Sequence, residues 1–223
     1  MKRKDILLLA CLLPFTSGLI NSMGLQFFEV VTTNVAGHFG TLLQRLLNQK
    51  YALGLSLLGG VVVYGLSAFG ATLLSETQPN TKHKFLLLLP IIFNVAVLLF
   101  FQVQSASARS FWEIWLLFAG MGAYNAFSSN LTNGQVKPSQ LTGLIIDACI
   151  DSAKIAAKTH PLASCVAFRR KNQVRWLIVL FFSLGIVANV GINQLIDLPM
   201  AVLPLLFLVI VLWVLAVKIQ QKN

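Results

Sequence analysis

The sequence predicts an all-α, polytopic transmembrane helix bundle. Of the 223 residues, 57% are apolar and only 11% are charged, and the mean hydropathy is +0.77. A soluble domain carries about 25% charged residues, so this chain has too little charge to cover a globular surface in water. It also contains six long apolar stretches, each near the ~20 residues that a helix needs to cross a bilayer. Composition therefore excludes a soluble enzyme and a disordered chain.

The apolar stretches define the expected elements in order. The long ones cover residues 6–28, 52–75, 84–103, 111–128, 174–197 and 199–217. Two shorter stretches, 35–48 and 139–157, are amphipathic, and we predict a helix start or a helix break at Gly37 and at Gly143. The basic segment 158–175 between two stretches is predicted to be a loop. The first stretch continues well past Cys11, which favours a retained span over a signal peptide.

The order of these elements repeats. Long, short, long, long is followed by long, short, long, long, which predicts a single membrane domain over residues 1–223 built from two similar halves, 1–105 and 106–223. Each half places an asparagine three residues after a glycine near the end of its first span. These motifs are Gly18-Leu-Ile-Asn21 and Gly122-Ala-Tyr-Asn125. Each half then opens its short helix with a glycine motif, Val35-Ala36-Gly37 or Leu141-Thr142-Gly143.

With these motifs in this order, the chain resembles the DUF1275 family, also called YoaK-like, of uncharacterised bacterial integral membrane proteins. The resemblance runs from about Leu7 to Val217. The chain has Asn21 where the family usually has Asp, and Val35-Ala36-Gly37-His38 in place of a Met-Thr-Gly-Asn turn. The resemblance implies a fold and a location in the bacterial plasma membrane, and it implies no catalytic residues.

Positive charge predicts that both termini are cytoplasmic, because short cytoplasmic loops collect Lys and Arg. If both short helices cross, the chain crosses eight times and three of its 17 basic residues lie outside: Lys82, Lys84 and Lys137. If neither crosses, the chain crosses six times, the halves are inverted, and the three outside are Arg45, Lys50 and Arg109. The two topologies satisfy the charge rule equally well.

Aromatic residues favour eight crossings. Trp112, Trp176 and Trp213 would then form one belt at the cytoplasmic interface. The stretch from Gly37 to Asn48 has a length of only about 18 Å as a helix, short of a ~30 Å hydrocarbon core. It could cross only through an unwound segment from Thr33 to Gly37, which a protein-lined cavity can tolerate.

The candidate functional residues are polar groups inside the apolar stretches. Charges there are costly and usually face a cavity or a partner. The resulting polar pathway comprises Asn21, His38, Arg45, Asn125, Thr142, Asp147, Asp151 and Lys154. In one interpretation a carboxylate of Asp147 or Asp151 carries a proton or binds a cation, and Arg45 is the counter-charge from the other half. In the alternative, the short helices lie at the interface and their charges meet water and headgroups.

Two functions follow. The first is a small permease-like, secondary-transporter-type protein for an unknown solute, since interrupted helices at matching positions of two halves mark transporter sites. The second is a non-transporting membrane scaffold or regulatory subunit. We find no enzyme motif such as HExxH or GxSxG, and we expect no catalytic residue, cofactor or metal. The expected partners are the lipid bilayer and a small solute or proton, with a homo-oligomer left open and nucleic acid excluded.

Overall fold

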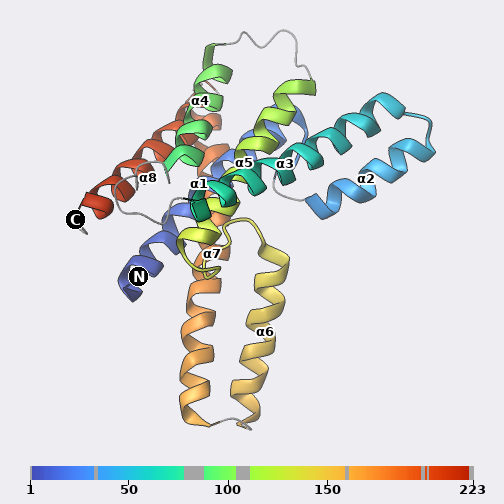
Figure 1. Cartoon of the computed structure of the whole chain (residues 1–223). Helices are drawn as coiled ribbons and strands as arrows, with labels where there is room; N and C mark the ends of the chain where they lie inside the picture. The colour runs from blue at the N-terminus through green and yellow to red at the C-terminus, as the bar shows by residue number, and fades with distance from the viewer. Residues whose placement is uncertain are drawn as a thin grey trace.

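The structure is a computed structural model that describes residues 2–32, 35–77, 88–103, 111–158, 161–196, 199 and 201–220. Within these ranges every regular element is a helix and no strand is present, which confirms the predicted class (Figure 1). The helices are α1 (Arg3–Phe28), α2 (Val35–Leu47), α3 (Tyr51–Thr77), α4 (Leu89–Val103), α5 (Phe111–Leu131), α6 (Leu141–Ala157), α7 (Leu162–Leu195) and α8 (Val202–Gln220). Three of them, α1, α3 and α7, are long and apolar enough to cross a membrane, and α4 and α8 contain shorter apolar helices. Six long spans were expected.

The predicted loop at 158–175 is largely wrong. Helix α7 begins at Leu162 and runs without interruption through the basic residues to Leu195. Hydropathy misses this part because Arg, Lys and Gln are polar, yet all three are good helix formers. Pro161 precedes the first turn, where a proline is well tolerated, and no glycine follows until Gly185.

Helices α1 and α5 lie inside the bundle. Helix α1 packs along α7, and α3 packs along α5, and these are the two most extensive contacts between helices. Helix α4 contacts α5 as α8 contacts α1, and α2 contacts α3 as α6 contacts α7. Helices α1 to α4 therefore correspond in order to α5 to α8. When each helix is replaced by its counterpart, the set of extensive helix contacts stays the same, and the contacts of α1 with α5 and of α4 with α8 map onto themselves.

The two long contacts are made at small residues. A Cβ added to Gly18 of α1 would collide with the carbonyl oxygen of Phe182 on α7, and one added to Gly185 would collide with that of Phe15. In the other pair, a Cβ on Gly122 of α5 would collide with the carbonyl oxygen of Tyr64 on α3. Backbones approach this closely where glycines line the interface of membrane helices.

The outer helices expose apolar side chains. About 72% of the apolar window of α1 is buried, against 17% in α3 and 22% in α7. The exposed residues of α3 recur every three or four positions and form one stripe: Tyr51, Leu55, Leu58, Val62, Leu66, Phe69 and Leu73. Such a continuous apolar stripe is expected of a helix that faces lipid.

The short helices belong to two helical hairpins. Helix α2 pairs with the start of α3, and α6 pairs with the first half of α7 and extends away from the rest of the chain (Figure 1). Both short helices are continuous, and Gly37 and Gly143 are each the third residue of their helix. Both glycines therefore lie at the start of a helix, one of the two positions expected for them, and neither interrupts its helix. Residues 33 and 34, in the expected unwound segment, lie outside the described residues.

Candidate functional site: a charged helical hairpin and a basic pocket

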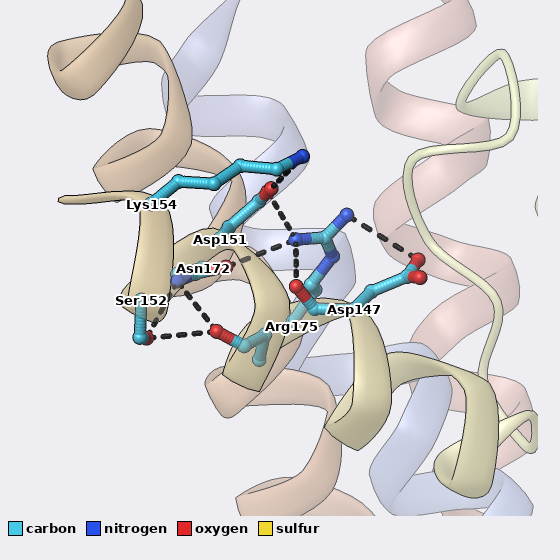
Figure 2. A network of polar contacts seen from close by, with 7 residues as sticks. Asp147, Asp151, Ser152, Lys154, Asn172 and Arg175 are labelled. Carbon is cyan, nitrogen blue, oxygen red and sulfur yellow. Dashed lines mark hydrogen bonds and ion pairs between the residues drawn. The ribbon is translucent and has the colours of Figure 1, made fainter. Parts of the chain in front are cut away.

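The charged residues of α6 converge on Arg175 of α7 (Figure 2). Its Nη1 donates to Asp151 Oδ2 at 2.7 Å, and its Nη2 lies 3.3 Å from Asp147 Oδ2. Nη1 also donates to Asn172 Oδ1 at 2.9 Å and to the backbone oxygen of Asp147 at 3.2 Å. The guanidinium is thus fixed by two carboxylates and an amide, in the fork geometry that arginine provides.

Asn172 of α7 makes further hydrogen bonds to α6, next to these ion pairs. Its Nδ2 donates to the backbone oxygen of Ala148 and to Ser152 Oγ, both at 3.1 Å (Figure 2). Asn172 is buried, and each of these contacts joins α7 to α6. The hairpin is therefore held by polar contacts along its inner face.

The two carboxylates differ in their exposure. The side chain of Asp151 is 9% exposed, and that of Asp147 is 57% exposed. Lys154 Nζ lies 3.7 Å from Asp151 Oδ1 and 5.3 Å from the centre of the Phe168 ring. The opposite face of α6 is apolar and exposed, through Ile145, Ile146 and Ile150. Asp151 therefore faces α7, Asp147 and Lys154 lie at the edge of this contact, and the three isoleucines face outward.

The expected counter-charge is wrong. Arg45 lies half-buried on α2, in the other hairpin, and the structure gives its expected position beside Asp147 and Asp151 to Arg175 (Figure 1). Thr142 lies exposed in the first turn of α6. The ion pairs therefore join neighbouring helices of the second half.

The two asparagines that occupy matching positions of the repeat make matching contacts. Asn21 Oδ1 accepts a hydrogen bond from Thr32 Oγ1 at 3.4 Å, just before α2. Asn125 Oδ1 accepts one from Ser139 Oγ at 3.0 Å, just before α6, and Asn125 Nδ2 donates to Tyr64 Oη at 2.9 Å. In both halves, an asparagine late in the first helix binds the hydroxyl that leads into the short helix.

His38 joins the first of these groups. Its Nε2 lies 2.6 Å from the backbone oxygen of Val31, next to Thr32, and its ring lies 5.0 Å from that of Phe118. The side chain is buried. Among the described residues, no cluster of three or more His, Cys, Asp and Glu side chains is placed to hold a metal ion. His38 is thus a packed, hydrogen-bonded residue at the entry to α2.

A pocket of about 550 Å³ opens where the start of α1, residues 133–140, the start of α6 and the middle of α7 meet. Five cationic side chains line it: Arg3, Lys137, Arg170, Lys171 and Arg175. Asp147 is the acidic residue of its lining, and Gly143 forms part of the wall. Arg3 is held by a 2.7 Å hydrogen bond from its Nη2 to Gln173 Oε1. The pocket is strongly electropositive.

Comparison with known families covers nearly the whole chain. Residues 9–215 match the family model described as "Protein of unknown function (DUF1275)". The chain belongs to the DUF1275 family. No curated protein and no solved structure matches this DUF1275 chain. Family membership confirms the resemblance seen in the motifs around Asn21 and Asn125.

Sequence reasoning missed several residues of this DUF1275 protein. Arg175, Asn172 and Arg170 were assigned to a loop, so they were not considered as partners of α6. Tyr124, which is fully buried and donates from its hydroxyl to the backbone oxygen of Leu13 at 3.1 Å, joins α5 to α1. A helical-wheel reading of residues 162–175 would have placed Asn172 and Arg175 on one face, at a spacing of three residues.

Proposed function

We propose that this chain is a small permease-type membrane protein built from two halves of opposite orientation. The observation that carries the proposal is the matching set of helix contacts, in which α1 with α7 corresponds to α5 with α3. The glycine crossings at Gly18 and Gly122 and the amide contacts of Asn21 and Asn125 follow the same correspondence. Inverted repeats of this kind are common in secondary transporters, whose substrate sites lie between the halves.

The proposed topology has six crossings with both termini cytoplasmic. Lys137 lines the same pocket as Arg3 near the amino terminus and Arg170 on α7. Groups that share a pocket lie on one side of a membrane, which supports a chain that enters and leaves the α6 hairpin on that side. With six crossings, all three residues lie on the cytoplasmic side of the membrane. With eight crossings, Lys137 lies on the outer side and the other two on the cytoplasmic side. Of the 17 basic residues of the chain, four lie outside the described residues: Lys82, Lys84, Arg109 and Lys222.

The length of α7 supports the same topology. Its 34 residues would extend about 51 Å, which exceeds a ~30 Å hydrocarbon core. The segment from Trp176 to Leu195 alone has the length of one crossing, and its first residue is an exposed tryptophan of the kind that marks an interface. The preceding segment carries Arg169, Arg170, Lys171 and Arg175, which are costly in hydrocarbon.

Several polar groups of α1 and α7 are buried inside the bundle and support the proposal of a polar path through it. Ser17 Oγ and Asn189 Oδ1 are buried without a hydrogen-bond partner among the described residues. Asn189 Nδ2 lies 3.3 Å from Ser22 Oγ and 3.2 Å from Gln26 Oε1. Buried polar atoms without partners are rare and commonly bind an internal water or a ligand. A polar solute or proton passing along α1 would meet these groups.

Flux measurement tests the permease proposal. The purified full chain in liposomes is challenged with concentration jumps of potassium phosphate, sodium acetate and choline chloride, and charge movement is recorded on a supported membrane. We expect a saturable current with one or more of these solutes, absent from protein-free liposomes and reduced by Asn189→Leu. If a folded, helical protein gives no current with any of them and no counterflow of neutral sugars or amino acids, the proposal fails. The alternative of a non-transporting scaffold or regulatory subunit would then replace it.

A further inference from the structure

We infer that the basic pocket binds a phosphate-type anion, either a free phosphate or the phosphate of a lipid headgroup. This inference does not depend on transport, because a non-transporting membrane protein can hold such an anion equally well. The pocket volume of about 550 Å³ is within the 300–1,000 Å³ that small-molecule sites occupy. It is lined by both the first helix and the second half of the chain.

The charge of the lining selects the ligand class. Arg3, Lys137, Arg170 and Lys171 are exposed, whereas Arg175 is largely buried. Asp147 is the carboxylate that faces them, and Asp151 is turned into the contact between α6 and α7. Opposite charges attract more strongly at the lower effective dielectric of a protein surface than they do in bulk water. Several cations around one cavity therefore favour an anion, and both a free phosphate and a lipid phosphodiester carry the required negative charge.

Two of the cations are positioned in advance. Gln173 fixes Arg3, and the contacts with Asp151 and Asn172 fix Arg175. Arg guanidinium groups bind phosphate oxygens through parallel N–H donors, so fixed arginines suit a tetrahedral oxyanion. The exposed Lys137 and Arg170 supply side chains that can adjust to its size.

The start of α6 adds to the same field. Gln140 and Gly143 line the pocket, and α6 begins between them at Leu141. Gln140 makes no side-chain cap, and a Cβ placed on Gly143 would meet nothing within 4 Å. The positive end of the helix dipole is therefore open toward the pocket, where it favours an anion.

Binding to the full chain in phosphatidylcholine nanodiscs tests the site. The probe is ³³P-labelled inorganic phosphate at low ionic strength, and Lys137→Gln combined with Arg170→Gln is the pocket variant. The matched control combines Lys158→Gln with Arg169→Gln, which removes the same amount of charge at residues that do not line the pocket. We expect saturable binding that weakens at least tenfold in the pocket variant and less than twofold in the control.

A second arm identifies a lipid source. Phosphatidylglycerol is added to the detergent-purified protein, and retained lipid is counted by native mass spectrometry. Retention that is lost in the pocket variant and kept in the control, without binding of free phosphate, assigns the site to a headgroup. If neither probe binds, or if the control loses as much binding as the pocket variant, the inference is overturned.

Discussion

Two aspartates one helical turn apart contact the same arginine in unequal surroundings. Asp151 is buried and bonded to Arg175 at 2.7 Å, whereas Asp147 is largely exposed and lies 3.3 Å away. Sequence reasoning identified both carboxylates and their common helix face, since a spacing of four residues fixes that face. It could not identify Arg175, because a partner from another helix depends on packing.

This difference gives a prediction for stability. Asp151→Asn removes a charge from a largely buried ion pair, and we expect it to destabilise the protein by about 1.5–3 kcal/mol. Asp147→Asn removes a solvent-exposed partner, and we expect a cost below about 1 kcal/mol. Denaturant unfolding in one detergent, followed by circular dichroism, measures both. Equal effects of the two variants would show that the burial difference has no energetic consequence.

The glycine crossings give a second prediction. Gly185→Ala places a methyl group against the backbone oxygen of Phe15, and α1 and α7 must separate to accommodate it. Such overpacking costs about 1–3 kcal/mol. Gly191→Ala lies on the same helix with nothing within 4 Å of the added Cβ, so its better helix propensity should leave stability unchanged or raised. A thermal unfolding series that ranks Gly191→Ala below Gly185→Ala would contradict the crossing.

At the scale of elements, each expected apolar stretch corresponds to one helix of the described residues, and the largest error is the start of α7. The stretch expected at 139–157 is α6 (Leu141–Ala157), and that expected at 35–48 is α2 (Val35–Leu47). Helix α7 begins at Leu162 although its apolar stretch begins near residue 174. Hydropathy reports the part of a helix that lipid covers, and a helix that continues beyond the lipid appears shortened.

Helix α7 should therefore consist of two parts with different solvent access. We expect backbone amides in Trp176–Leu195 to exchange with deuterium more slowly than those in Leu162–Arg175, because lipid excludes water from the former alone. Exchange mass spectrometry in nanodiscs measures both segments in one experiment. The same measurement in detergent is the control for intrinsic helix stability. Equally strong protection of the two segments in nanodiscs would indicate that the hairpin is embedded in lipid.

At the scale of the whole molecule, order and spacing predicted two similar halves, and this remains a prediction that the matching contacts support. The way in which the halves interlock was not predictable. Each first helix packs on the third helix of the other half, through Gly18 and Gly185 or through Gly122 and Tyr64. A sequence pattern shows which residues are small, but it does not show which helix they contact.

The six-crossing, inverted topology is the central claim, and cysteine labelling tests it most directly. Lys50→Cys and Lys137→Cys are each introduced into a background in which Cys11, Cys149 and Cys165 are replaced, and intact cells are treated with a membrane-impermeant thiol reagent. Our account predicts that the cysteine at position 50 is labelled from outside and that the one at position 137 reacts only after the membrane is permeabilised. Labelling of position 137 and protection of position 50 in intact cells would contradict it.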